Sequence, residues 1–600
     1  MYDLIIKAAF RLYKNKRFSK PAIAVCATIL VGKLSYDRYR KRQTMQKIRD
    51  KQAKLLDNKQ GLKQRLVQPD GQLLTEERVS IVNKTAPELV ALMTQGTLDP
   101  VDVLQAFQAK ALIVDEKINA VCEYITEAVQ WASELRKIPL DQRGPLYGLP
   151  VSVKECFFIE GYDSTIGLAG LIGQPLPKDS RFVNYIKKAH GIPFCITNVP
   201  QTMFSFRCSN PIFGESCNPH DLTRTPGGSS GGEAALLAAG GSPFGLGSDI
   251  GGSIRIPATF CGIYGLKPST GRLYHEGRRN NDGTGLKALR PCINSTAGFM
   301  TPNMESLTFG MKIILGSLER VREMGQEDWR VIPLPWQEDL FEPTRKLRVG
   351  WYDDDGFFPA MPGCKRAVHE VVERLKEAGH SVTEWKGIDH TEFFRTFSEI
   401  ILSDLGYHSL KQWKGEILDK CIEVNALNYK CPEKMRWLLS AITRLFSKKT
   451  KMLVEAHPTL SRDLWVTNAK RDSLIDAMMA EWNRHDFDIV ICPGFPFPAP
   501  PHKYPTRILP ASSYTGVYNV TGQPVGCLPV TRETQSDQDN MAHYPVSADL
   551  THQLAFNATK GAVGCPLGIQ VVGRHYQEEM VLQAMEIIAN LVDYDHTVPS

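Results

Sequence analysis

Three serines in glycine-rich turns are the residues of this chain whose types and spacing fit hydrolytic chemistry. They are Ser229, Ser230 and Ser253, and ten glycines fall between Pro226 and Gly252. Glycine permits positive φ and close backbone approach, so main-chain N–H groups in such a segment can be aimed at a ligand. Amide hydrolysis needs a nucleophile, a base and donors for an oxyanion. The segment therefore predicts a serine hydrolase that requires no histidine.

Ser253 has the surroundings expected of a nucleophile. It directly follows the run Asp249-Ile250-Gly251-Gly252, where consecutive N–H groups can converge on one oxygen. Each such donor is worth about 2.7 to 4 kcal/mol in known cases. The spacing alone does not reveal the base.

Residues 228–232 also match the GxSxG elbow, which would make Ser230 the nucleophile of an α/β-hydrolase with a distant histidine. That elbow follows a strand, and Arg224-Thr225-Pro226 does not read as one. A flexible glycine-serine loop is a second alternative, but apolar residues interleave the segment. Because GxxxxGK[ST], HExxH and EF-hand patterns are missing from the sequence, no phosphate cradle and no metal site is predicted.

Three segments carry a resemblance to a known family. Residues 227–268, GGSSGGEAALLAAGGSPFGLGSDIGGSIRIPATFCGIYGLKP, resemble the amidase signature. Members of that family use a serine, a second serine preceded by a cis peptide, and a lysine. Residues 150–165, PVSVKECFFIEGYDST, resemble the family's lysine strand and place the lysine at Lys154. Residues 566–585 resemble its closing strand and helix.

The resemblance implies a role for each residue of the site. Ser253 would attack the carbonyl carbon, Ser229 would shuttle the proton, and Lys154 would be the base, with Ser230 supporting the lysine by hydrogen bonding. The oxyanion hole would consist of backbone N–H groups, those of Ile250, Gly251, Gly252 and Ser253. No cofactor is implied.

The lysine imposes a condition on its surroundings. It is a base only when neutral, so burial must lower its pKa by several units. Glu155 would oppose this, but strand alternation predicts that Glu155 points to the opposite face. Cys156 completes a Lys, Glu and Cys set similar to that of nitrilases; because the nitrilase residues are dispersed in sequence, we expect Cys156 to be a packed thiol.

Further matches narrow the resemblance to animal fatty-acid amide hydrolases. They are KECF with GYDST, and TNVPQTMFSFRCSNPIFG from Thr197, in which Met203 and Phe204 match positions that line an acyl channel. This implies a membrane-associated homodimer that cleaves long-chain fatty-acid amides. The alternatives are a general amidase, the glutaminase subunit of an amidotransferase, and a catalytically dead lipid-binding scaffold.

Composition and charge limit the classes of protein to which the chain can belong. The chain has 600 residues, 42% of them hydrophobic and 23% charged, and a net charge of +6. These values indicate a globular protein, and the basic residues are too concentrated near the N-terminus for a nucleic-acid-binding surface. The fourteen cysteines follow no CxxC pattern, so reduced, mostly buried thiols are expected.

We expect residues 1–42 to be a membrane-anchor segment, because residues 21–32 are apolar and flanked by basic residues. An amphipathic surface helix is the alternative. The basic flank after the apolar run is heavier, which predicts a cytosolic catalytic body if the segment spans the membrane. We expect the membrane to be that of the endoplasmic reticulum. Residues 43–80 read as a charged helical connector, and residues 81–600 as the catalytic domain.

Within that domain, strands and helices alternate. Strands are expected at 149–153, 192–197, 347–351, 488–492 and 567–572, and helices at 181–189 and 367–378. This alternation predicts an α/β fold of the amidase-signature type, with a central mixed, twisted sheet covered by helices on both faces.

Residues 432–454 predict a membrane-facing amphipathic helix. Apolar residues recur there at helical spacing beside the basic residues Arg436, Arg444, Lys448, Lys449 and Lys451. The alternative is a helix packed on the body with a basic outer face.

Overall fold

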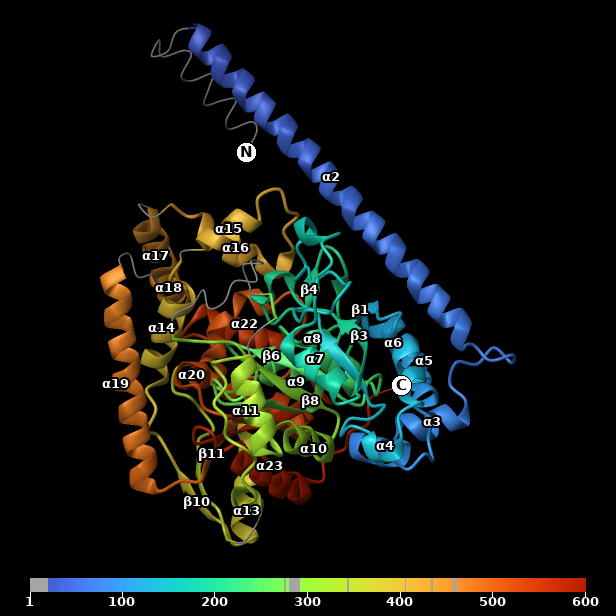
Figure 1. The fold of residues 1–600 in the computed structure, drawn as a ribbon. Helices are drawn as coiled ribbons and strands as arrows, with labels where there is room; N and C mark the ends of the chain where they lie inside the picture. The colour runs from blue at the N-terminus through green and yellow to red at the C-terminus, as the bar shows by residue number, and fades with distance from the viewer. Residues whose placement is uncertain are drawn as a thin grey trace.

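An eleven-stranded mixed sheet forms the centre of the molecule (Figure 1). The computed structural model describes residues 20–274, 277–279, 292–342, 345–404, 406–432, 435–456 and 461–599. The strand order is β1-β3-β2-β6-β8-β7-β12-β13-β11-β9-β10. The strands are β1 (Val121–Tyr124), β2 (Pro150–Lys154), β3 (Ile192–Thr197), β6 (Gly245–Asp249), β7 (Tyr264–Lys267), β8 (Thr296–Thr301), β9 (Arg348–Trp351), β10 (Ser381–Glu384), β11 (Ile489–Pro493), β12 (Val525–Arg532) and β13 (Pro566–Gly573).

Helices cover the sheet on both faces, as predicted (Figure 1). The longer ones within the body are α4 (Ala86–Thr94), α5 (Pro100–Ile118), α7 (Arg181–Lys188), α8 (Gly231–Ala238), α9 (Arg255–Cys261), α10 (Met304–Leu315), α11 (Leu318–Glu327), α13 (Pro362–Glu377), α14 (His390–Ile401), α19 (Ser461–His485), α20 (Ser513–Thr521), α22 (Leu550–Thr559) and α23 (Glu578–Val592). The expected strands and helices lie within a few residues of the observed ones. The described cysteines are free and mostly buried.

Local sequence accounts for these elements. Strands β3 and β13 are buried along their whole length, and continuous apolar runs are typical of strands covered on both faces. Helix α4 begins with a capping box between Thr85 and Glu88, and α5 begins at Pro100 after the Asp99 cap. These are the starts that the sequence predicts.

Strands β2 and β6 matter most for the site. They are parallel neighbours, with Ser152 opposite Gly245 and Val153 opposite Leu246. Lys154 ends β2, and Ser248 lies near the end of β6. The pairing therefore brings two residues that are 94 positions apart to the same edge of the sheet.

A single long helix, α2 (Lys20–Leu66), runs along one side of the body (Figure 1). It continues through the boundary expected between residues 42 and 43, so the proposed anchor and connector share one helix. Its second half is attached by buried Ile48 and Leu62 and by ion pairs from Lys51 to Glu123 at 2.7 Å and from Lys59 to Asp115 at 2.6 Å. In the described part of the chain, no helix combines the length and apolarity needed to cross a membrane.

The single helix expected over residues 432–454 is corrected to two, α17 (Arg436–Arg444) and α18 (Lys448–Glu455). The break occurs because the buried Ser447 side chain accepts from the Thr450 N–H at 2.9 Å and starts a new helix. The Lys448 N–H is at the same time bound by Asp549 at 3.0 Å. Exposed apolar side chains gather on α17 and the turn after it: Met435, Trp437, Leu438, Ile442, Leu445 and Phe446.

Candidate active site

Lys154 and Ser229 meet in a fully enclosed site. The Lys154 Nζ lies 2.7 Å from the Ser229 Oγ, and neither the lysine nor its strand is exposed to solvent. The lysine also donates to the Ser248 Oγ at 2.9 Å and to the Ser248 carbonyl oxygen at 3.2 Å. A lysine and a hydroxyl at this distance can exchange a proton.

The glycine-rich turn that carries Ser229 has the backbone that the resemblance implies. The Gly228–Ser229 peptide bond is cis. Gly227 has φ 90°, and a Cβ there would lie 2.7 Å from the Pro257 Cα, so the turn needs glycine. The residues before the turn form a loop and not a strand, which contradicts the α/β-hydrolase alternative for Ser230.

Ser230 links the turn to the predicted nucleophile. Its N–H donates to the Ser253 carbonyl oxygen at 3.2 Å, and its hydroxyl donates to the Ser248 carbonyl oxygen at 3.4 Å. The structure thus places Ser230 beside the lysine by way of Ser248. Ser253 is half-buried, directly before helix α9.

The predicted oxyanion loop is held by Asp249. Its carboxylate accepts from the Gly252 N–H at 2.8 Å and the Ile254 N–H at 3.1 Å. The Gly252 N–H already donates to Asp249, so it can donate to an oxyanion only if that hydrogen bond breaks. Its oxyanion role stays a prediction. The N–H groups of Ile250, Gly251 and Ser253 remain as candidate donors.

Asp249 is fixed in turn by a fully buried ion pair with Arg255 at 3.0 Å. Arg255 also donates to the Thr515 carbonyl oxygen at 3.0 Å and to the Asn519 side chain at 2.6 Å. The arginine holds the pKa of Asp249 well below its usual range, although burial opposes this. The charged carboxylate thereby organises the backbone around Ser253.

Burial lowers the pKa of Lys154 from its ordinary 10.5 to about 8. The cause is desolvation of the ammonium, which outweighs the attraction of Asp249. A substantial fraction of the amine is therefore neutral near physiological pH, as a base requires.

Glu155 and Cys156 lie as predicted. The Glu155 carboxylate is directed away from the lysine and accepts from the Thr165 hydroxyl at 2.8 Å and the Ile166 N–H at 2.8 Å. Burial raises the pKa of Glu155 to about 7. Cys156 is a buried thiol whose pKa is raised by desolvation.

Comparison with known proteins now identifies the family. Residues 102–582 match the family model described as Amidase. The chain belongs to the amidase family. It is 35% identical over 506 residues to fatty acid amide hydrolase 1 of Caenorhabditis elegans, covering 83% of this chain and 86% of that protein. It is also 35% identical over 509 residues to fatty-acid amide hydrolase 1 of Sus scrofa, covering 84% and 85%.

A solved structure described as fatty acid amide hydrolase matches with a TM-score of 0.78 and 25% identity, covering 92% of this chain and 96% of that one. Membership of the amidase family makes the protein an amide-hydrolysing enzyme and confirms the fold that the signature implies.

The sequence did not reveal the contacts of three side chains near this site: Ser248, Arg255 and the Asp249 carboxylate. The spacing of Asp249 and Arg255 about the glycines is a signal that would have suggested an ion pair across the loop. Ser248 had no such signal, because its contact with the lysine depends on the β2–β6 pairing.

Met203 and Phe204 form a turn near the amidase site. They belong to or directly follow the short helix η3 (Gln201–Met203), and Met203 is buried while Phe204 is half-buried. Thr202 and Met203 have φ of 64° and 58°, an uncommon conformation for non-glycine residues. The Asn425 side chain of α16 (Glu423–Lys430) donates to the Phe204 carbonyl oxygen at 3.1 Å. The acyl-channel role of the two residues stays a prediction.

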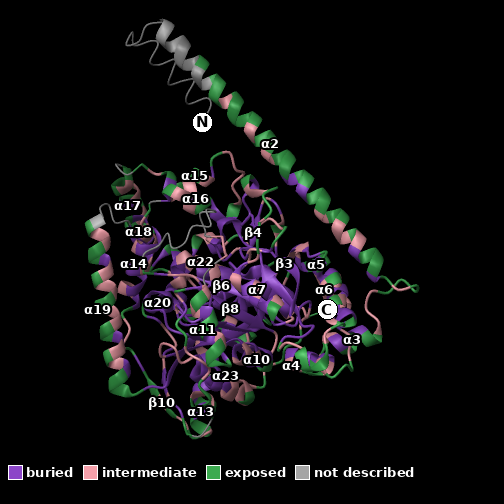
Figure 2. Cartoon of the chain, viewed as in Figure 1, coloured by how far each residue is buried: buried purple, intermediate pink, exposed green. Residues whose placement is uncertain are grey.

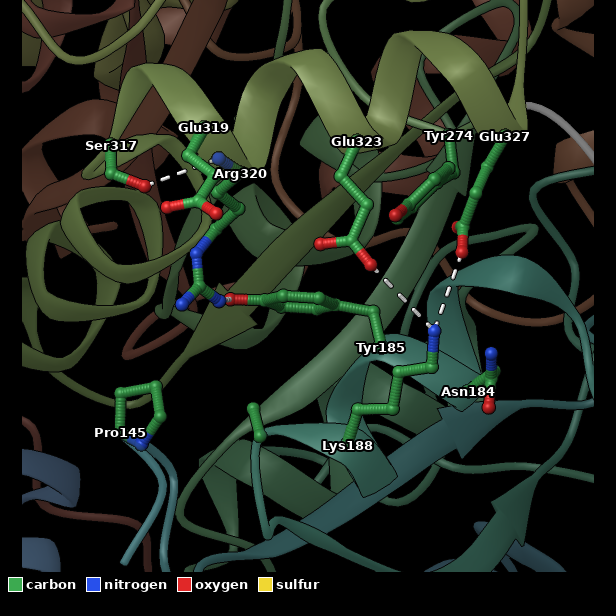
Figure 3. Close-up of a pocket in the computed structure, with 11 residues that line it drawn as sticks. Pro145, Asn184, Tyr185, Lys188, Tyr274, Ser317, Glu319, Arg320, Glu323 and Glu327 are labelled. Carbon is green, nitrogen blue, oxygen red and sulfur yellow. Dashed lines mark hydrogen bonds and ion pairs between the residues drawn. The ribbon is translucent and has the colours of Figure 1, made fainter. Parts of the chain in front are cut away.

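A separate hollow of about 270 Å³ lies between α7 and α11 (Figure 3). Arg320 donates to the Tyr185 hydroxyl at 2.6 Å, and Lys188 pairs with Glu327 at 3.4 Å. Since its charged side chains largely neutralise one another, the hollow offers little recognition for an ionic ligand.

Proposed function

We propose that this amidase hydrolyses long-chain fatty-acid amides, such as N-acylethanolamines and primary fatty amides, at a membrane surface. The observation that carries the proposal is the enclosed Lys154–Ser229 contact beside Ser253. The identity to two fatty-acid amide hydrolases over most of the chain supports the substrate class.

The Lys154–Ser229 contact supports the following mechanism, which is part of the proposal. Neutral Lys154 takes a proton from Ser229 as Ser229 takes one from Ser253, and the Ser253 oxygen bonds to the carbonyl carbon. Backbone N–H groups of the 250–253 loop stabilise the oxyanion. The C–N bond then breaks as the proton returns through Ser229 to the amide nitrogen, which leaves as the amine or ammonia. Water cleaves the acyl-enzyme with the same base and releases the fatty acid.

One feature supports a lipid substrate: the exposed apolar surface of α17 and of the turn after it, here called the cap. Trp437 is 69% exposed and Leu445 is 78% exposed, the pattern of a surface that lies in a membrane interface. The alternative of a helix with its apolar face packed on the body does not fit this exposure. An acyl chain in an apolar channel gains about 0.8 kcal/mol per buried CH₂, which favours long chains.

We further propose that residues 1–42 anchor the enzyme to the endoplasmic reticulum with the catalytic body in the cytosol, and that it acts as a homodimer. The support is the apolar run at 21–32 and the heavier basic flank after it. Protease protection of microsomes tests the orientation, and sedimentation in detergent tests the dimer.

The decisive experiment combines a fluorophosphonate probe with a series of acyl amides. We expect mass spectrometry to locate the probe on Ser253 and hydrolysis to increase with acyl length. An unlabelled Ser253 contradicts the mechanism and favours the lipid-binding scaffold. Hydrolysis of acetamide or glutamine without long-chain activity favours the general amidase or the glutaminase subunit.

A further inference from the structure

Between helix α2 and the loop after α15 (Tyr407–Gln412) lies a second cavity, of about 350 Å³, which is within the range of ligand-binding pockets. One wall is the face of α2 that carries Arg40, Gln43, Thr44 and Lys47. The opposite wall is the loop after α15 (Tyr407–Gln412), including Lys414, Gly415 and Glu416, and the floor is η2 (Ala169–Leu171) with its neighbours.

The cavity is a fixed part of the fold. Below it, Ile48 of α2 is buried against Ala169 and Ile212. Above this contact, the Thr44 hydroxyl lies 3.0 Å from the Gly415 carbonyl oxygen, and Arg40 donates to the Lys414 carbonyl oxygen at 3.1 Å. Apolar and polar contacts therefore hold α2 and the loop at a set separation.

Gly415 allows the arginine to approach. A Cβ at Gly415 would lie 2.6 Å from the Arg40 Cζ, and Gly415 has φ +88°. The guanidinium thus packs directly against the loop backbone. Because a guanidinium carries five N–H donors in a planar fork, Arg40 can bind an anion while keeping its bond to Lys414.

The charge of the lining is strongly positive. Arg40, Lys47 and Lys414 supply three cations, and Glu416 is the acidic residue of the lining. The Glu416 carboxylate accepts from the N–H groups of Ala169 at 2.9 Å and Gly170 at 2.6 Å. Two donors thus satisfy the carboxylate, and the three cations dominate the cavity.

We propose that this cavity binds the phosphate group of an anionic phospholipid. Arg40 would engage two phosphate oxygens in a fork, and Lys47 and Lys414 would supply point charges. The lipid source follows from position, since α2 continues from the cavity toward the apolar and basic segment at 21–42. This lipid source rests on the membrane association in the proposed function, whereas the anion chemistry does not depend on amidase activity.

Vesicle binding of the full-length enzyme tests the proposal. The site variant replaces Arg40, Lys47 and Lys414 with Gln. The control variant replaces Lys41, Arg42 and Arg49 with Gln; these residues are exposed on other faces of α2, and the change in net charge is the same. Vesicles of phosphatidylcholine with and without phosphatidate are compared. Removing any basic residue near an anionic surface costs about 1 kcal/mol. We expect the site variant to lose about tenfold more affinity for phosphatidate vesicles than the control variant loses.

Equal losses in the two variants would show general electrostatic attraction and overturn the site. Wild type that binds phosphatidylcholine vesicles but gains nothing from phosphatidate overturns the site and leaves the membrane proposal intact, whereas binding to neither vesicle contradicts both. A site that binds inorganic phosphate without the vesicle difference overturns the lipid source. A variant with Lys47→Arg and Lys414→Arg, in which Arg40 is retained, keeps the charges and should bind as wild type does, which excludes a folding defect as the cause.

Discussion

At the residue scale, the proposed chemistry depends on a lysine that loses its proton more readily inside the protein than in water. Burial keeps the pKa of Lys154 at about 8, while Ser229 and Ser248 orient it. The adjacent carboxylate of Glu155 accepts hydrogen bonds from Thr165 and Ile166 and makes no ion pair with the lysine. The base and the proton shuttle are thus defined by three hydrogen bonds and by the exclusion of water.

Replacing Ser253 by Ala should abolish turnover, with a loss of about 10³-fold or more, because the attacking oxygen is removed. Replacing Lys154 by Ala should cost about 10² to 10⁴-fold through loss of the base. The rates are measured on a long-chain fatty amide, with thermal unfolding as the folding control. Near wild-type rates in either variant contradict the assignment.

The pH dependence has a defined sign. Since only the neutral amine is a base, kcat/KM should rise as the pH is raised and level off above about 8. Between about pH 8 and 10.4 the unfolded lysine binds more protons than the folded one, so the free energy of unfolding gained from Lys154 also rises with pH. The Lys154→Met variant should lose both slopes, and its stability at pH 7 should equal or exceed that of wild type. A variant with the same pH-rate profile as wild type would reject the lysine as the base.

At the element scale, the Asp249–Arg255 ion pair fixes the backbone of the predicted oxyanion loop. Asp249→Asn should lower kcat by about 10²-fold, because displaced N–H donors no longer meet the oxyanion. The matched control is Glu578→Gln, which breaks an ion pair with Arg272 of the same 3.0 Å length and complete burial. Both variants should lose stability, but only Asp249→Asn should lower the kcat of the folded enzyme. Equal kcat losses would assign Asp249 a purely structural role.

The exposed apolar surface of the cap makes a second prediction at this scale. Replacing Trp437, Leu445 and Phe446 with Ser should weaken binding to phosphatidylcholine vesicles and raise KM for long-chain amides, with kcat for a short, soluble amide unchanged. The control replaces Leu140, Leu318 and Trp329, which are exposed by 63%, 44% and 80% on other elements. If both triple variants behave alike, the cap is not the membrane contact.

Some of these elements could be predicted from the sequence, and others could not. Strand β3 and the starts of α4 and α5 are marked by apolar runs and caps, which are local signals. The break at Ser447 was missed although the Ser447 cap on Thr450 is a local signal, and the bond from the Lys448 N–H to Asp549 that accompanies it spans 101 residues. Ser248 was missed because strand pairing brings it to Lys154. Long-range pairing is the part of the fold that a single sequence does not display.

At the scale of the whole molecule, a long helix joins the N-terminal segment to the catalytic body (Figure 2). Residues 31–42 of this helix are mostly exposed, and its later part is held by Ile48, Lys51 and Lys59. The helix therefore connects residues 31–42 directly to the packed body.

Removal of residues 1–32 should leave the hydrolysis of a short, soluble amide unchanged, because the packed half of α2 remains. Recovery of the enzyme in the membrane fraction should fall severalfold. Fractionation and initial rates measure the two effects. Loss of short-amide turnover in the truncated enzyme would show that this segment supports the site itself.

The distance in sequence between Lys154 and Ser248 has a consequence for biosynthesis. While the polypeptide is still emerging from the ribosome, Lys154 is synthesised long before its partner, and it remains a hydrated ammonium that already holds its proton and cannot accept another. Only when folding buries the side chain beside Ser248 does its pKa fall to about 8, so that a neutral amine able to accept a proton is present. An incompletely folded chain is therefore expected to lack the proposed base.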